Sequence, residues 1–139
     1  MEKKHVIAVA LLESNRRRGG EALYVVTRRR QDVHLAGMWE LPGGKVERGE
    51  TPVEALHREL QEELGVRIRD TKLLVVSSHD YPEKSVCIHF FRARLTLDSP
   101  EPSPLEAAEL RLLTRAEILD LTMPPANEAF LEHLRSLRI

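Results

Sequence analysis

The stretch GGKVERGETPVEALHRELQEELGV, residues 43–66, contains the most clearly marked helix of the chain. Thr51 is a favoured N-cap residue, and Glu54 three positions later completes a capping box. Pro52 suits the first helical position, and Gly65 stands where a left-handed C-cap belongs. The sequence therefore predicts a helix between these two caps.

Three glutamates crowd one side of this predicted helix. The apolar residues Val53, Leu56, Leu60 and Leu64 form one stripe, and the neighbouring arc carries Glu59, Glu62 and Glu63. Like charges three and four positions apart on a helix repel one another. Clustered carboxylate oxygens suit Mg²⁺ or Mn²⁺, and a bound ion would remove the repulsion. The pattern therefore predicts a divalent-metal site, with an ordinary solvated acidic face as the alternative.

The rest of the chain alternates strand-like and helix-like segments. Apolar, β-branched runs at 5–13 and 21–29 predict a hairpin around the loop SNRRRGG. Further strands are predicted over 39–41, 66–79, 84–97 and 110–113. A capping box of Thr114 and Glu117 opens a short helix to about residue 121, and the run 123–137 starts a last helix with Phe130, Leu134 and Leu137 on one face. Such mixing predicts an α/β layered fold with a mixed sheet.

Length and composition narrow the class of protein and its partners. A chain of 139 residues fits one domain, and we expect residues 1–139 to form it. The net charge of −1, with both signs intermixed, argues against nucleic acid or a membrane surface as a partner. The first apolar segment is too short for a membrane span and lacks a signal cleavage site, so we expect a cytoplasmic protein. The single cysteine excludes a disulfide framework, and the oligomeric state is not indicated.

The helix and its entry loop also match a family signature. Every position of the Nudix box is present in this segment. The box consists of Gly44, five residues, Glu50, seven residues, Arg58-Glu59-Leu60, one residue, Glu62-Glu63, one residue and Gly65-Val66. The chain therefore resembles the Nudix hydrolases. This resemblance implies a single Nudix domain with an α/β/α sandwich around a mixed sheet and a divalent cation such as Mg²⁺ or Mn²⁺. It also implies hydrolysis of a pyrophosphate bond in a small-molecule nucleotide, a nucleoside diphosphate linked to another group.

The resemblance also implies roles for residues of the box. The metal ligands would be the carboxylates of Glu59, Glu62 and Glu63 and the carbonyl oxygen of Gly43. Arg58 would orient the carboxylates, and Glu50 would support the entry loop. Hydrolysis at phosphorus requires charge neutralisation and a positioned, partly deprotonated water. Glu59 is the first candidate for the base that accepts the proton.

A further acid is expected outside the box. Nudix hydrolases similar to this chain often supply a metal-binding acid from a loop six positions before a late strand. Glu106 has this spacing to Leu112, and Glu109 is its competitor. Glu106 is also the second candidate for the general base. Lys45, which follows two glycines, is a candidate phosphate contact, although an exposed lysine there is as often a bystander.

Three more stretches resemble the MutT branch of the family, namely TRRR at 27–30, GMWELPGGK at 37–45 and PPANE at 124–128. MutT-type enzymes hydrolyse 8-oxo-dGTP to 8-oxo-dGMP and pyrophosphate, and the resemblance implies this reaction here. It implies that Asn127 reads the oxidised guanine and that Arg29 helps to enclose the ligand. An Asn amide offers a donor and an acceptor, which match O6 and the protonated N7 of the base. The alternatives are a helix N-cap for Asn127 and solvated strand-end charge for Arg29.

One position departs from the MutT pattern. Leu41 stands where MutT-type enzymes commonly place an aromatic residue against the base, so it would line the base site without stacking. CTP, modified pyrimidines or a broad range of dNTPs therefore stay open as substrates. A catalytically silent nucleotide-binding module is the alternative of another class, although such a module need not keep all three glutamates. His34, His57 and His89 have no spacing that suggests a metal site, and we expect structural roles for them.

Overall fold

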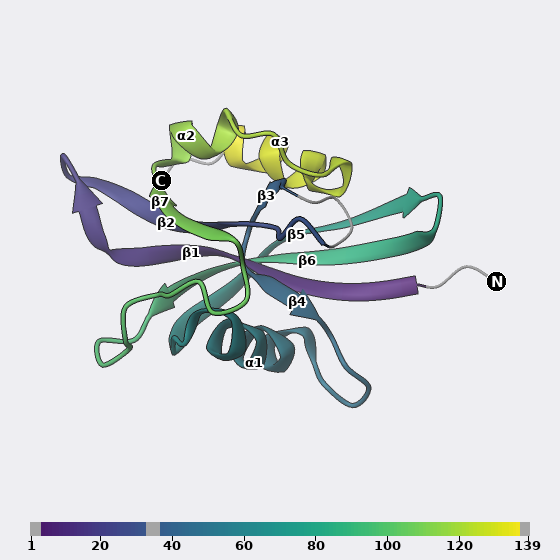
Figure 1. Ribbon diagram of the computed structural model, residues 1–139, viewed down its shortest axis with the longest axis horizontal. Coiled ribbons are helices and arrows are strands. Elements are labelled where there is room, and N and C mark those ends of the chain that lie inside the picture. Colours follow the sequence, from purple (N-terminus) through teal and green to yellow (C-terminus); the bar gives the residue numbers. More distant parts are fainter. Residues whose placement is uncertain (1–3, 33–36, 137–139) are drawn as a thin grey trace.

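The computed structural model describes residues 4–32 and 37–136 (Figure 1). Its strands are β1 (Lys4–Arg18), β2 (Glu21–Arg28), β3 (Trp39–Glu40), β4 (Gly43–Lys45), β5 (Ile68–Tyr81), β6 (Lys84–Leu95) and β7 (Glu109–Leu113). Its helices are α1 (Pro52–Leu64), α2 (Arg115–Leu119), the 3-10 helix η1 (Pro125–Asn127) and α3 (Glu128–Ser136). Within these described ranges, no helix is long and apolar enough to cross a membrane.

The strands form one mixed sheet in the order β3-β2-β1-β6-β5, with β4 added to β1 and β7 added to β2. β1 and β6 run parallel, and the other pairs are antiparallel. β1 is shared, because its first half pairs with β4 and its second half with β2. The register places Gly43 opposite Val9 and Gly44 opposite Ala8. Gly44, the first residue of the Nudix box, and Gly43 before it therefore lie against the middle of the sheet.

Helices cover both faces of this sheet, with α1 on one side and α2 and α3 on the other (Figure 1). On the first side, the leucine stripe of α1 is fully buried against small and apolar residues of β1, β2 and β6. On the second side, Phe130 of α3 stacks on Phe90 of β6 with ring centroids 4.9 Å apart. Burial of each such side chain stabilises the fold by roughly 1.5 to 3 kcal/mol. The predicted α/β/α sandwich with a mixed sheet is confirmed.

Helix α1 begins and ends where the sequence predicts. The hydroxyl of Thr51 accepts a hydrogen bond from the N–H of Glu54 at 3.2 Å, and the Glu54 carboxylate accepts from the N–H of Thr51 at 2.9 Å. Gly65 has the left-handed φ of 72° and donates its N–H to the carbonyl of Gln61 at 2.9 Å. The second predicted capping box is present at α2. Both caps are confirmed.

The first hairpin is longer than predicted. The polar run SNRRR, predicted as a loop, is strand, because Arg17 pairs with Ala22 and Arg18 pairs with Glu21. Only Gly19 and Gly20 form the turn, with φ of 57° and 84°. Two positive φ values in a two-residue loop match the twist of an antiparallel hairpin, and glycine adopts them without strain. The predicted seven-residue loop is therefore wrong, since polarity alone does not distinguish an exposed strand from a loop.

Two other predicted boundaries also change. The segment after Pro42, predicted as a stop, continues as β4, because its backbone pairs with β1 although glycine has little strand preference of its own. The last helix is preceded by the 3-10 turn η1 and begins only at Glu128. Phe130 and Leu134 are fully buried as predicted, and Leu137 lies outside the described residues.

Candidate active site

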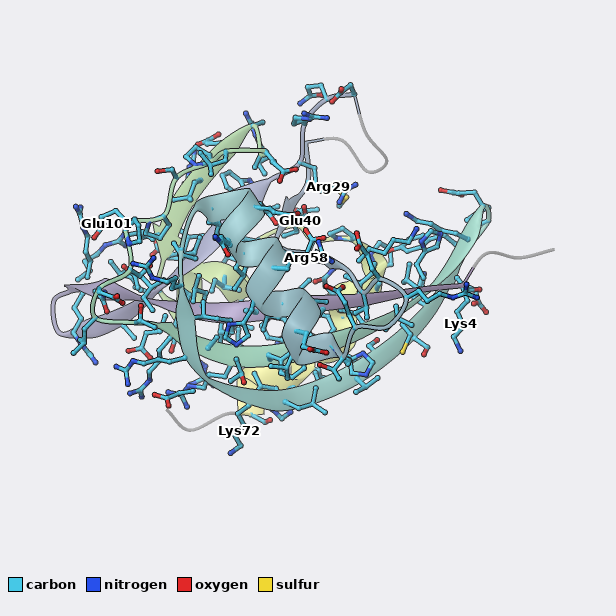
Figure 2. The ribbon with its side chains drawn as sticks, turned by 90° about the horizontal axis from the view of Figure 1, so that it is seen from below. Lys4, Arg29, Glu40, Arg58, Lys72 and Glu101 are labelled. Carbon is cyan, nitrogen blue, oxygen red and sulfur yellow. The ribbon has the colours of Figure 1, made fainter. Side chains whose placement is uncertain are left out.

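Arg58 lies at the centre of the acidic face of α1. Its Nε and Nη2 donate to the two carboxylate oxygens of Glu50 at 2.7 and 2.9 Å. Its Nη1 donates to Glu59 at 2.9 Å and to Glu62 at 3.3 Å. In this structure the positive charge of Arg58 therefore offsets the repulsion for which the sequence predicted a metal ion. Figure 2, which views the molecule from the α1 side, labels the side chain of Arg58 where it projects from the helix.

Glu50 fastens the entry loop to α1. Besides the two hydrogen bonds from Arg58, it accepts one from the N–H of Glu47 at 2.9 Å, and Arg58 Nη2 also donates to the carbonyl of Lys45 at 2.9 Å. The hydrogen bonds from Arg58, followed by the one from the backbone of Glu47, lower the pKa of Glu50 to about 2. Glu50 thus stays ionised near neutral pH. This geometry agrees with the loop-supporting role that the resemblance implies, and the role itself stays a prediction.

Glu63 is the most enclosed of the three glutamates. One carboxylate oxygen accepts a hydrogen bond from the N–H of Gly43 at 3.1 Å, and the other accepts from the hydroxyl of Thr27 at 3.4 Å. Burial raises the pKa of Glu63 to about 8, and the charges of Glu40, Glu59 and Glu106 act in the same direction. Glu63 therefore holds a proton at neutral pH when no cation is bound.

Glu59 lies directly against the backbone of Gly44. A Cβ atom at Gly44 would overlap the Glu59 carboxylate, so a residue with a side chain would push this carboxylate away. Burial raises the pKa of Glu59, although the hydrogen bond from Arg58 opposes the shift. Glu62 is the most exposed of the three, with 52% of its side-chain surface accessible. The three carboxylates thus differ in environment although they share one helix face.

The loop that carries Glu106 is held against the end of α1. The N–H groups of Ser103 and Leu105 donate to the last carbonyls of the helix, those of Leu64 and Glu63, each at 3.0 Å. The charge of Glu106 raises the pKa of both Glu59 and Glu63, which places it near them.

Glu109 has other partners. It pairs with Arg28 at 3.3 Å and with Arg111 at 2.7 Å at the start of β7. The arrangement favours Glu106 over Glu109 as the loop acid, and metal binding by Glu106 stays a prediction.

The oxygen donors fit a hard divalent cation, but they are not yet grouped around one point. Among the described residues, no three His, Cys, Asp or Glu side chains are placed to hold one metal ion. Arg58 holds Glu59 and Glu62, while Gly43 and Thr27 hold Glu63. Glu59 and Glu63 nevertheless both meet the Gly43–Gly44 segment. Carboxylate and carbonyl oxygens are the ligands that Mg²⁺ and Mn²⁺ prefer, so the donor chemistry of these residues fits such an ion.

A cavity of about 270 Å³ lies beside β4, between the first half of β1, β6 and η1. All four residues predicted to bind substrate line it, namely Arg29, Leu41, Lys45 and Asn127. Gly43 and Gly44 also line the cavity and contact the glutamates of α1. The sequence therefore predicted a set of residues that the fold gathers around one space, and their contact with a substrate stays a prediction.

Asn127 is buried in the wall of this cavity, with 7% of its surface accessible. Its side-chain Nδ2 donates to the carbonyl of Pro124 at 3.3 Å. Asn127 directly precedes α3 and so stands at its N-cap position, but an N-cap side chain accepts a hydrogen bond from the backbone of the following turn, whereas Asn127 donates to the turn before it. The observed hydrogen bond fixes the amide plane and does not correspond to the N-cap alternative.

The aromatic residue of this cavity is Tyr81, which the sequence did not single out. Its hydroxyl accepts a hydrogen bond from the N–H of Ala126 at 3.1 Å and so ties the end of β5 to η1. Leu41, by contrast, is almost fully buried in the core below the cavity. Tyr81 therefore supplies the cavity with an aromatic side chain, which Leu41 cannot provide.

Glu40 was also missed. It pairs with Arg29 at 3.0 Å in the cavity wall, and burial raises its pKa while the charge of Arg29 lowers it (Figure 2). A glutamate inside an apolar strand is a detectable signal, because a buried acid needs a partner. Arg28 and Arg30 pair with Glu109 and Asp32. The prediction for His34 lies outside the described residues.

The matches between this chain and known proteins extend over nearly its whole length. The family model described as the NUDIX domain matches residues 3–134. The 8-oxo-dGTP diphosphatase of Escherichia coli strain K12 is 32% identical over 135 residues, which are 97% of this chain and 99% of that protein. The solved structure of the E. coli ORF135 protein has a TM-score of 0.77 and 27% identity, and the match covers 99% of this chain and 92% of that one. The MutT protein from Methanosarcina mazei Go1 has a TM-score of 0.74 and 25% identity, covering 96% and 94%.

Proposed function

Because this chain belongs to the Nudix family and is a pyrophosphohydrolase of that family, we propose that its preferred substrate is 8-oxo-dGTP, which it hydrolyses to 8-oxo-dGMP and pyrophosphate. The observation that carries the proposal is the buried Asn127 amide, which lines a cavity that reaches the glutamates of α1 through Gly43 and Gly44. The 8-oxo-dGTP diphosphatase relative and the MutT structure support it. The cytoplasmic location stays a prediction.

The chemistry of Asn127 suits an oxidised purine. Its amide offers an acceptor for the protonated N7 of 8-oxoguanine and a donor for O6. Ordinary guanine carries an unprotonated N7, so its edge presents two acceptors and leaves the amide oxygen unpaired. A buried polar group without a partner costs roughly 1 to 3 kcal/mol. This difference is the proposed source of selectivity for 8-oxo-dGTP over dGTP.

The reacting end of the substrate would lie at the glutamates. Nudix hydrolases generally use divalent metals, and here we propose Mg²⁺ or Mn²⁺, held by Glu59, Glu62, Glu63, Glu106 and the carbonyl of Gly43. Such an ion neutralises charge on the phosphate oxygens and lowers the pKa of a bound water. Arg58 positions the carboxylates, Glu50 keeps the loop in place, Lys45 contacts a phosphate, and Arg29 helps to enclose the nucleotide. Glu59 is the proposed general base.

A nucleotide panel tests the proposal. With Mg²⁺ present, 8-oxo-dGTP should have a higher kcat/KM than dGTP or CTP, and the products should be the monophosphate and pyrophosphate without free phosphate. A preference for another nucleotide, such as CTP, is the competing outcome. It follows from Leu41, because an aliphatic residue stacks on a nucleobase less strongly than an aromatic residue does. A higher kcat/KM for CTP, or equal values for all three nucleotides, would contradict the proposed substrate and leave family membership unaffected.

A further inference from the structure

A second and larger cleft lies on the same face of the sheet as the Asn127 cavity, at the opposite end of β1. Its volume is about 560 Å³, and its walls come from β1, β2, β6 and α2. Glu13 lines this cleft, whereas Val9, four residues earlier on the same strand, lines the Asn127 cavity. The two cavities share no lining residue. The proposed reaction therefore makes no use of this cleft.

The cleft is strongly basic. It is lined by four arginines, Arg17, Arg92, Arg94 and Arg115, and by two glutamates, Glu13 and Glu21. These residues give an excess of two positive charges at one place in a chain whose net charge is −1. A local excess of this kind attracts anions, because a cleft with low-dielectric walls concentrates the field of the charges that line it.

Glu13 is a single carboxylate shared by three guanidinium groups. It is mostly buried, and the nearest nitrogens of Arg17, Arg92 and Arg94 lie 3.7, 3.8 and 3.8 Å from its oxygens. These distances are longer than hydrogen bonds. Among the described residues, no acceptor takes a hydrogen bond from the side chain of Arg92 or Arg94. Glu13 therefore holds both guanidinium groups in the lining of the cleft through charge, and their donors can still form hydrogen bonds to a further acceptor.

The other two arginines are held at the rim by backbone oxygens. Arg115 donates Nε to the carbonyl of Leu134 and Nη2 to that of Arg135, both at 2.9 Å. Arg17 donates Nη1 to the carbonyl of Gly20, also at 2.9 Å. Arg115 also bridges α2 to the end of α3. Both guanidinium groups are thus fixed before any ligand arrives, which reduces the entropy lost on binding.

We propose that this cleft is a second anion site, which binds a small, multiply charged phosphate anion of the pyrophosphate or oligophosphate class. Guanidinium groups match phosphate oxygens through paired hydrogen bonds. A small anion fits better than a nucleic acid, because the arginines surround one carboxylate instead of following an extended track. The proposed site is independent of the nucleotide that the active site prefers, because the two cavities share no lining residue.

The test is a titration of the chelator-treated protein with inorganic pyrophosphate, followed by NMR of the backbone amides. The amides of Ala22, Arg94 and Ala116 should shift in the wild type, separately from any shifts at Gly43 and Gly44. Arg92→Thr combined with Arg94→Thr should weaken this binding by about tenfold or more. The control, Arg16→Thr combined with Arg18→Thr, removes the same charge outside the cleft and should bind as the wild type does.

A third variant reverses the sign of the expected effect. Glu13→Gln removes the central negative charge and keeps the size of the side chain, so pyrophosphate should bind about threefold tighter or better. The anion could be a free phosphate anion or the oligophosphate chain of a nucleotide, and a parallel titration with ATP distinguishes the two. If ATP binds more tightly than pyrophosphate and shifts the same amides, the ligand is a nucleoside-linked oligophosphate. Three results would each overturn the proposal. Pyrophosphate could shift only the amides of Gly43 and Gly44, or it could bind the Arg92/Arg94 variant and the control with equal affinity. The cleft could also bind only oligonucleotides, with an affinity that grows with their length.

Discussion

Replacing Glu63 with glutamine should stabilise the metal-free protein above neutral pH, although it removes a predicted metal ligand. The folded-state pKa of Glu63 is about 8, against 4.5 for an ordinary glutamate. The folded state therefore holds a proton that the unfolded chain releases. For a carboxylate with a raised pKa, the stabilising contribution is complete below the unfolded pKa and is lost as the pH rises through the folded pKa. The stability of the metal-free wild type should fall between about pH 4.5 and about pH 8.

The structure sets the size of this effect. A shift of this size corresponds to roughly 2 to 4 kcal/mol at about pH 8, with an allowance for the partial solvent access of the side chain. For a chain of 139 residues, each kcal/mol moves Tm by about 3 °C, so the difference should be about 6 to 12 °C. The glutamine of the Glu63→Gln variant can keep both hydrogen bonds, because its oxygen can accept from Gly43 and its amide can donate to the hydroxyl of Thr27.

The assay is differential scanning calorimetry in excess chelator, from about pH 5 to about pH 9. The wild-type Tm should fall across this range relative to that of Glu63→Gln, which should be more stable at the alkaline end. Glu62→Gln is the matched control, since it makes the same chemical change on the exposed side of the helix. Parallel Tm curves for wild type and Glu63→Gln would show that the carboxyl group of Glu63 beside Gly43 does not have a raised pKa.

Two further predictions concern turnover. Glu62→Gln should lower kcat by at least about a hundredfold while the fold stays intact, because a predicted ligand of a charge-neutralising metal is lost; wild-type kcat in this variant would count against the metal site. Glu106→Ala should lower kcat more than Glu109→Ala, because Glu106 lies near Glu59 and Glu63 while Glu109 pairs with Arg28 and Arg111; steady-state assays that show a loss only in the Glu109 variant would reverse this assignment.

The structural features that the sequence predicted best are those that depend on residues close together in the chain. The caps of α1 depend on residues within one turn, and both ends of the helix are confirmed. The leucine stripe and the acidic arc follow from the helical period alone. What the sequence could not locate depends on strands that meet from distant parts of the chain. β4 exists because its backbone pairs with β1, and the strand character of Arg17 and Arg18 comes from pairing with β2.

The charges show the same division. The sequence predicted a cation among the glutamates, but it did not show that the guanidinium group of Arg58 lies among them, because the direction of this side chain depends on the entry loop. Thr27 and Glu40 reach the site from β2 and β3, so their proximity to Glu63 is a product of the sheet. The basic cleft likewise gathers arginines that are up to 98 positions apart in the sequence, between Arg17 and Arg115.

The role of Asn127 in reading the oxidised base is tested by the selectivity of the Asn127→Ala variant. The measurement is the ratio of kcat/KM for 8-oxo-dGTP to that for dGTP, in the variant and the wild type, with Glu128→Gln as a neighbouring exposed control. The ratio should fall by about ten- to a hundredfold, mainly through KM for the oxidised nucleotide, because a buried donor and acceptor lose their pairing with the base. An unchanged ratio, whether or not Tm falls, would contradict the account that Asn127 reads the oxidised base.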